Sequence, residues 1–355
     1  MKKLFVCALA LAMVFAFTAP TMAADWNFYG SARFATYSED VDTRVPGVES
    51  DVDTLWATQA NSRIGANVSG GDVGGRFEMS SSFGLRLLYG TWNFGAGTLL
   101  VGQDYSPIAE FYSNQVWGGD EDLLSNGMAY DGRQGQIKLI FGNFKLAFIT
   151  PVTSGNIGGA APAGDTDTTL PKMALSYKFA TDMFSVKPYL GYQTYDQDTG
   201  VGTVQESVTS LVYGLGGKVN FGPAYVAANV WGGTNAGNYG MAIADAGAGT
   251  AGVNVNGGIE DATTLAYAGV IGFKASDMFI IEGGYGAAKS ELDFAGSKTE
   301  DSSFSYYINC TINLAPGVFI VPEFGKYSLD TIDTAGVSTD QTETTYFGAK
   351  WQINF

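Results

Sequence analysis

The strongest constraint on the fold is a two-residue alternation of apolar and polar side chains that continues to the end of the chain. Counting back from Phe355, alternate positions carry Phe, Ile, Trp, Ala, Phe and Thr, and those between them carry Asn, Gln, Lys, Gly, Tyr and Thr. Segments 304–314, 211–221 and 173–179 repeat the pattern. Because successive side chains of a strand point to opposite faces, we expect an all-β fold whose strands each have one apolar face.

The connections between these segments alternate in length. Short turns are expected at 69–75, 95–97, 142–143, 180–185, 222–223, 276–277 and 315–317. Longer loops are expected at 38–54, 104–128, 152–170, 196–207, 233–260, 290–302 and 329–342, with a smaller one near 81–84. This alternation predicts about 16 strands in a transmembrane antiparallel up-and-down barrel, with short periplasmic turns and long extracellular loops. The strand from Trp26 would close against the strand ending at Phe355. No linker or composition break divides residues 24–355, so we expect a single barrel domain.

The first residues are typical of an export signal. Lys2 and Lys3 precede an apolar run from Leu4 to Phe17, and small residues before Ala24 predict cleavage after Ala23, so that residues 1–23 are a signal peptide. Beyond this segment no apolar run is long enough for a transmembrane helix. An exported chain of this kind is therefore either a secreted soluble β protein or an outer-membrane β-barrel.

Composition excludes several classes of function. The chain has no His, which removes the usual catalytic triads and His-liganded metals, so we expect no enzyme activity, no cofactor and no metal site. Its two Cys cannot build a zinc ribbon or an iron–sulfur cluster. The net charge of −16 argues against nucleic-acid binding. The pairs Asp40/Asp42 and Asp51/Asp53 could bind Ca²⁺, but they lack the EF-hand spacing, and solvated loop acids are favoured.

Several short segments resemble those of the general porins of Gram-negative outer membranes. They are Phe28-Tyr-Gly30 with Arg33, Asn61-Ser-Arg63-Ile-Gly65, Gly75-Arg-Phe-Glu78, Thr98-Leu-Leu-Val-Gly-Gln103 and the terminal Trp351-Gln-Ile-Asn-Phe355. The resemblance implies a third long loop folded into the lumen, a homotrimer, and a surround of outer-membrane lipid and lipopolysaccharide. It also implies that Trp351, Ile353 and Phe355 form the signal read by the barrel assembly machinery.

The loop 104–128 carries the candidate functional residues. It contains acids but no Lys or Arg, and its acidic residues are Asp104, Glu110, Asp120, Glu121 and Asp122. Strand alternation places four bases on the polar face of the first four strands, namely Arg33, Arg63, Arg76 and Arg86. An acidic loop opposite an arginine cluster would create a transverse field across a narrow aqueous gap. The arginines could instead pair with Glu78 or with loop acids for structure alone.

Two further features bear on the interior of the barrel. The stretch 232–258 is rich in Gly, Ala and Asn and occupies a loop position, where its G-x-G-x-x-G match at 247–252 lacks the strand and helix of a nucleotide site. Alternation places Arg133 outward, so either a bulge intervenes or Arg133 lies at the rim.

The favoured function is passive diffusion of small hydrophilic solutes and ions through a water-filled barrel. A mild cation preference is expected because many acids fall in the predicted outer loops. These acids are Glu39, Asp40, Asp42, Glu49, Asp51, Asp53, Asp330, Asp333, Asp340 and Glu343. The alternatives are a substrate-selective channel, for example for sugars, and a surface adhesin or structural barrel protein.

Overall fold

The computed structural model describes residues 24–44, 49–153, 165–200, 205–244, 249–254, 256–294, 297–334 and 337–355. The predicted signal peptide, residues 1–23, lies outside these described residues, and its cleavage stays a prediction. Across the described ranges, no helix is both long enough and apolar enough to cross a membrane.

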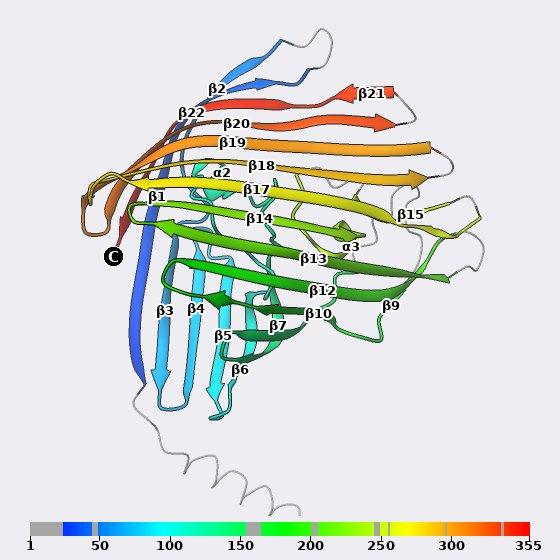
Figure 1. Cartoon of the computed structure of the whole chain (residues 1–355), viewed down its shortest axis with the longest axis horizontal. Coiled ribbons are helices and arrows are strands. Elements are labelled where there is room, and N and C mark those ends of the chain that lie inside the picture. Colours follow the sequence, from blue (N-terminus) through cyan, green and yellow to red (C-terminus); the bar gives the residue numbers. More distant parts are fainter. Residues whose placement is uncertain are drawn as a thin grey trace, which may run out of the picture.

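One antiparallel sheet contains nearly all the strands (Figure 1). Its first part comprises β1 (Asp25–Asp42), β2 (Asp51–Thr58), β3 (Arg63–Gly70), β4 (Val73–Ser80), β5 (Leu85–Asn93), β6 (Thr98–Tyr105), β7 (Arg133–Phe141) and β8 (Phe144–Ile149). Its second part comprises β9 (Thr166–Asp167), β10 (Lys172–Tyr177), β11 (Phe179–Ala180), β12 (Phe184–Asp198), β13 (Gln205–Phe221), β14 (Ala224–Thr234), β17 (Ala262–Lys274), β18 (Phe279–Phe294), β19 (Ser297–Ala315), β20 (Val318–Thr334), β21 (Val337–Asp340) and β22 (Glu343–Asn354).

The sheet closes on itself because β1 pairs with β22 along its length, from Ser31 opposite Asn354 to Asp42 opposite Glu343. The lower half of β1 pairs with β3 and the upper half with β2, so β2 and β3 form one barrel strand interrupted at 59–62. Strands β9, β10 and β11 lie successively along the same edge of β12, and β21 continues β22 along β20. Counted this way, the barrel has 16 strands, which confirms the predicted architecture.

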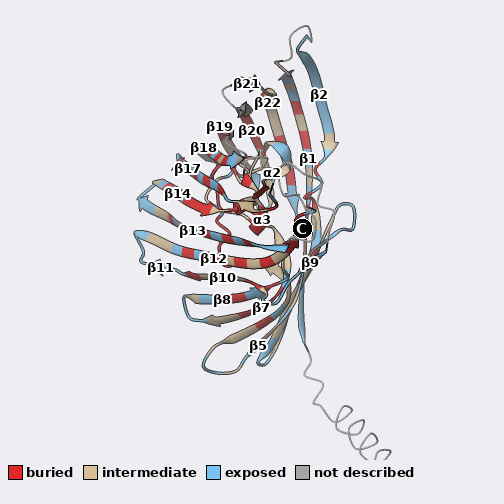
Figure 2. Ribbon diagram, turned by 90° about the vertical axis from the view of Figure 1, so that its right-hand side faces the viewer, coloured by how far each residue is buried: buried red, intermediate tan, exposed pale blue. Residues whose placement is uncertain are grey.

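The predicted alternation is visible as alternating burial along the strands (Figure 2). In β17, buried and exposed residues alternate from Ala262 to Gly272. Large apolar side chains such as Ile271, Ile308 and Phe347 lie on the outer surface and are more than half exposed there. Such an apolar outer face with polar positions turned inward is the pattern expected of a barrel surrounded by lipid.

The seven short turns lie where the sequence predicts them, but several predicted long loops are wrong. Strands β18 and β19 extend to Phe294 and Ser297, so most of 290–302 is paired strand, with Asp293 opposite Lys298. The stretch 329–342 is likewise largely β20, β21 and the approach to β22. The polar composition of these two stretches predicted loops. Antiparallel strands pair through their backbones, however, and need no apolar face where they do not face lipid.

The acids assigned to the first and last outer loops therefore lie mostly on strands. Glu39, Asp40 and Asp42 belong to β1, and Asp51 and Asp53 to β2. Asp330 and Asp333 belong to β20, Asp340 to β21 and Glu343 to β22, whereas Glu49 follows β1 in the connection. Within the described ranges, no cluster of three or more His, Cys, Asp or Glu side chains could hold a metal ion.

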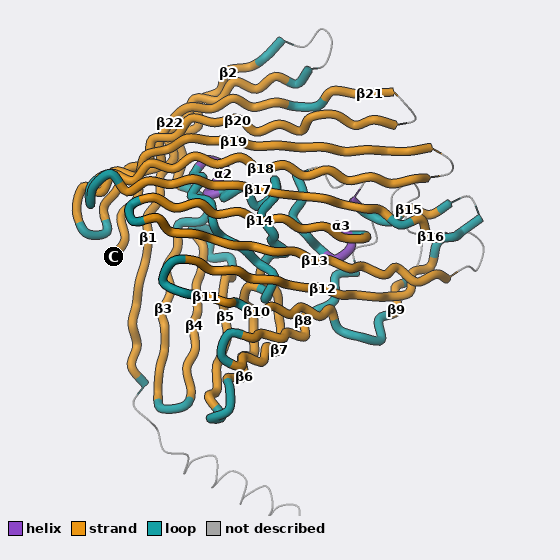
Figure 3. The backbone as a smooth tube through the Cα atoms, in the orientation of Figure 1, coloured by secondary structure: helices purple, strands orange, loops and turns teal. Residues whose placement is uncertain are grey.

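Two long connections fold into the barrel: the third loop (residues 106–132), which contains the short helix α2 (Trp117–Asp120), and the described parts of the sixth loop (residues 235–244, 249–254 and 256–261), which contain α3 (Ala236–Tyr239) (Figure 3). The sixth loop also carries a separate pair of two-residue strands, β15 (Gly252–Val253) and β16 (Ile259–Glu260). The predicted range 104–128 is corrected at both ends, because Asp104 belongs to β6 and the irregular segment continues to Gly132.

Candidate functional site

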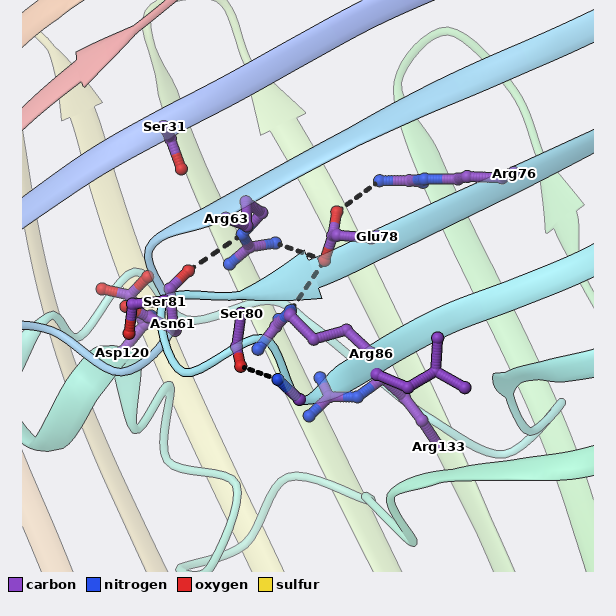
Figure 4. A network of polar contacts seen from close by, with 12 residues as sticks. Ser31, Asn61, Arg63, Arg76, Glu78, Ser80, Ser81, Arg86, Asp120 and Arg133 are labelled. Carbon is purple, nitrogen blue, oxygen red and sulfur yellow. Dashed lines mark hydrogen bonds and ion pairs between the residues drawn. The ribbon is translucent and has the colours of Figure 1, made fainter.

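A buried glutamate organises the predicted arginine cluster. The carboxylate of Glu78 on β4 lies 2.7 Å from Arg86 Nε, 2.9 Å from Arg76 Nη2 and 3.4 Å from Arg63 Nη1, and its side chain is 1% exposed (Figure 4). Tyr29 Oη donates a further hydrogen bond of 2.8 Å to it. Three guanidinium groups around one carboxylate leave an excess of positive charge on this wall.

The fourth predicted arginine is separate from this cluster and faces the third loop. Arg33 on β1 forms an ion pair with Asp120, and Lys350 Nζ on β22 lies 2.8 Å from the other carboxylate oxygen of Asp120. Both bases are largely buried, so solvent screens these contacts only weakly. Asp120 is thus compensated by two bases and fixes the loop against the strands that close the barrel.

A cavity of about 330 Å³ lies between the arginine wall and the third loop. Its charged lining consists of Arg63, Arg86 and Arg133 with Asp120 and Asp122. Aromatic side chains complete it: Tyr105, Phe111 and Tyr130 lie with ring centroids 5.1–6.2 Å apart. This cavity is the candidate constriction of the lumen, because it brings members of both predicted charge sets to one space.

Arg133 was missed as a member of this cavity. Its guanidinium donates a 3.0 Å hydrogen bond to Tyr105 Oη and lies over the Tyr105 ring, 5.4 Å from the centroid. Tyr105 and Arg133 are paired across β6 and β7 at the ends of both strands. The β6–β7 register runs without a shift up to this pair, so no bulge intervenes, and Arg133 lies at the end of its strand next to Gly132, whose φ is +84°.

The remaining acids of the third loop differ in their surroundings. Burial raises the pKa of Asp122, and the neighbouring carboxylate of Asp120 adds to the rise. Burial also raises the pKa of Glu121, although the hydroxyl and backbone amide of Ser125 oppose the shift by donating hydrogen bonds to its carboxylate. Of the loop acids Asp120, Glu121 and Asp122, two therefore line the cavity, and Glu121 instead stabilises the loop's own fold.

Asp104 and Glu110 lie outside this cavity. Asp104 on β6 accepts a 2.6 Å hydrogen bond from Lys138 Nζ on β7. Glu110 pairs at 3.1 Å with Lys187 of β12. Burial raises the pKa of Glu110, and Lys187 acts in the opposite direction. The structure thus places these two acids in wall contacts of the loop stem.

Two glutamates of the facing wall hold the loop's backbone. Glu323 on β20 accepts hydrogen bonds of 2.8 and 2.9 Å from the backbone N–H groups of Val116 and Trp117. Glu282 on β18 accepts one of 2.6 Å from Asn114 N–H. Both glutamates are nearly fully buried. Sequence reasoning missed them, although an acid on the inward face of an otherwise apolar or small-residue strand is the signal that could have identified them.

The tip of the loop reaches the opposite wall. Asn229 Nδ2 donates a 2.9 Å hydrogen bond to Gly127 O, and a Cβ on Gly286 would lie 1.8 Å from Asn126 O. Only glycine therefore permits this approach at position 286. The third loop consequently crosses the lumen from β6 to β18 rather than lining its own side.

The predicted assembly residues lie on the outer surface: Trp351, Ile353 and Phe355 are 47%, 52% and 72% exposed. Backbone hydrogen bonds of Phe355 with Gly30 join the end of the chain to the first strand. Their recognition by the assembly machinery stays a prediction.

No family model matches the chain, and the search of curated proteins found no match. Solved structures do match. The outer membrane channel DcaP of Acinetobacter baumannii aligns over 94% of this chain and 98% of its own, with a TM-score of 0.71 and 17% identity. The trimer form of OmpT of Vibrio cholerae covers 94% and 100%, with a TM-score of 0.59 and 14% identity. The anion-selective porin from Comamonas acidovorans covers 94% and 100%, with a TM-score of 0.54 and 14% identity. The chain therefore shares the fold of Gram-negative outer-membrane porins, a closed barrel of 16 antiparallel strands.

Proposed function

We propose that the chain forms a water-filled outer-membrane channel for passive diffusion of small hydrophilic solutes and ions. The observation that carries this proposal is the polar cavity between the arginine wall and the third loop, inside a barrel with an apolar exterior. Fixed charges around a narrow aqueous passage admit hydrated solutes and disfavour apolar ones. We further propose a homotrimer in outer-membrane lipid and lipopolysaccharide, inserted by the barrel assembly machinery.

The proposal is tested by reconstituting the purified, folded protein in planar bilayers. We expect discrete conductance steps, and liposome swelling with neutral sugars that slows smoothly as the sugar grows. A folded protein that opens no channels would contradict the proposal. A sharp preference for one sugar, irrespective of size, would instead favour a selective sugar channel. Chemical cross-linking in native membranes would test the trimer.

Two observations lead to opposite expectations for the ion preference of the channel. The acids on the outer parts of β1 and β2 favour cations at the mouth, as predicted from the sequence. The constriction favours anions, because its arginines outnumber its acids and Asp120 is already compensated by Arg33 and Lys350. Fields act most strongly where the passage is narrowest and least screened.

We therefore propose, as a second candidate, a channel that favours small anionic solutes at its constriction. Reversal potentials in a KCl gradient distinguish the two preferences. Cation preference that persists at 1 M salt would reject the anionic constriction, because the mouth charges are then screened within about 3 Å. Anion preference that strengthens as salt is raised would support it.

A further inference from the structure

A buried ion pair joins the two inward loops to the barrel wall. Lys172 at the start of β10 lies 2.8 Å from Asp131 Oδ2, and both side chains are fully buried. The same ammonium donates a 2.9 Å hydrogen bond to the backbone oxygen of Tyr239 and lies 4.0 Å from the centroid of that ring. Asp131 belongs to the third loop and Tyr239 to the sixth, so one charge contacts wall and both loops.

Asp131 also closes the stem of the third loop. Ser106 Oγ donates a 2.5 Å hydrogen bond to Asp131 Oδ1, which ties the first residue of the loop to its end. Tyr130 directly precedes Asp131 in the sequence, and Arg133 follows it two residues later. Both Tyr130 and Arg133 line the constriction cavity. A displacement of Asp131 would therefore be passed directly to an aromatic ring and a guanidinium group of the cavity.

The sixth loop supports the third through backbone contacts. Ala242 N–H donates a 2.7 Å hydrogen bond to Tyr130 O, and Ala244 N–H donates one of 2.9 Å to Ser125 O. Apolar packing surrounds the junction, where Ile108 and Ala129 of the third loop share one buried cluster with Tyr239 and Met241 of the sixth. The junction is thus dry, and its ion pair has no access to water that could replace a lost partner.

We propose that Lys172 and Asp131 are positioning residues that set the place of Tyr130 and Arg133 in the constriction and thereby its ion selectivity. This inference rests on the proposed channel function. Neither side chain contacts the cavity. Their effect on permeating ions acts through the third loop, with the sixth loop as the support that holds the loop against the wall.

The decisive variant is the double substitution Lys172→Met with Asp131→Asn. It leaves the net charge unchanged and removes the ion pair without leaving one buried charge alone, as Lys172→Met by itself would. Lys289→Met is the control, because Lys289 is half exposed on β18, far from the junction in sequence, and pairs with Glu291 and Glu300. Folding is checked by heat-modifiable gel mobility, and conductance and reversal potential are measured in planar bilayers.

We expect the folded double variant to change its anion-to-cation permeability ratio by about twofold and to show larger open-channel current fluctuations, with Lys289→Met unchanged at the constriction. Arg133→Ala should also be introduced into both the wild type and the double variant. The two resulting proteins should then have the same permeability ratio, because the double substitution acts on selectivity through Arg133. A folded double variant with wild-type selectivity would reduce the pair to a stability role and overturn the proposal.

Two further results distinguish failure of the channel proposal, or failure of the variant to fold, from failure of this inference. A wild-type protein that conducts no ions refutes the channel itself rather than this inference. If the double variant does not fold, hydrogen exchange of the wild type decides: slow exchange at the amides of Ala242 and Ala244, which bond to the third loop, supports the proposal. Fast exchange there would show that the loops are not held together and would overturn it.

Discussion

The two loops that enter the barrel do so by different chemistry. The third loop carries the acids and is held by charged partners, with Glu282 and Glu323 accepting its backbone N–H groups. The sixth loop is held by amide side chains and apolar packing in addition to the Lys172 ammonium: Gln193 donates to Asn238 O, and Asn238 donates to Tyr195 Oη. The third loop therefore exposes charged side chains to the cavity, whereas the sixth loop contributes buried apolar side chains that fill part of the lumen.

The polar cavity and the buried cluster that contains α3 occupy different parts of the barrel. Polar cavity residues come from β3, β5, β7 and the third loop, whereas the buried cluster that contains α3 is built on β8, β10, β12, β13, β14, β17 and β18. A barrel of 16 strands is wide enough for an aqueous channel. The described residues of the sixth loop fill part of that width and place no charged side chain in the cavity lining.

The largest effect should follow removal of the sixth loop. Replacing residues 240–258 with a short Gly-Ser connection would remove most of the residues of the sixth loop. We expect single-channel conductance to rise by roughly twofold or more, with a smaller change in selectivity. A matched deletion within the third loop should change both quantities, because it also removes Asp120 and Asp122. Equal selectivity changes in the two deletions would contradict the division of roles.

The anchors of the third loop come next. Glu323→Gln keeps the size of the side chain but weakens the bonds to the N–H groups of Val116 and Trp117. Hydrogen bonds to charged groups contribute about 1.5–3 kcal/mol, so we expect a loss of stability in that range. Denaturant unfolding in detergent measures it, together with current noise from a looser loop. Glu291→Gln on the exposed part of β18 is the control and should change stability by under about 1 kcal/mol.

Sequence predicted the barrel well because alternation, turn residues and closure all follow from local chemistry. The arginines at 33, 63, 76 and 86 were placed by the same alternation, and the structure brings three of them to Glu78. The outer part of the β18–β19 hairpin was predicted as a loop because its residues are polar. Charged pairs stabilise these strands where no apolar face is required, and they are formed by Lys289, Glu291, Lys298 and Glu300.

The inward course of the sixth loop was not predictable for a different reason. Its Gly, Ala and Asn residues carry no periodic signal, and their burial depends on contacts with Lys172 and Gln193, which lie far away in sequence. The low-complexity composition was consistent with an exposed loop. Glycine and alanine instead allow close packing inside the lumen, as where Gly240 meets Val152.

Single arginines of the constriction should have intermediate effects. Arg133→Ala removes a guanidinium that lines the cavity and donates a hydrogen bond to the hydroxyl of Tyr105, so its positive charge faces permeating anions. Arg76→Ala removes a charge that lies outside the cavity lining and is bound to Glu78 and Tyr29. We expect Arg133→Ala to lower the anion-to-cation permeability ratio by about twofold and Arg76→Ala to lower it less. Reversal potentials measure both, and the opposite order would contradict the assignment of the cavity as the constriction.

The smallest expected effect is a pH dependence from Asp122. Burial raises its pKa, and the carboxylate of Asp120 raises it further, whereas Lys350 opposes the shift. As pH falls, Asp122 therefore takes up its proton earlier than an ordinary aspartate, and the constriction becomes more positive. We expect anion preference to increase in mildly acidic solution, as Asp122 takes up its proton.

Reversal potentials recorded from neutral to mildly acidic pH check this expectation. Asp122→Asn should already show the acidic-pH selectivity at neutral pH and should lose this early step. Glu121 is the internal comparison: its pKa is also raised, but it bonds to Ser125 and does not line the cavity. Glu121→Gln should therefore leave the early step in place. An early step that disappears with Glu121→Gln and survives Asp122→Asn would assign the titration to the loop's internal fold, and the charge facing the permeating ions would then be carried by the arginines alone.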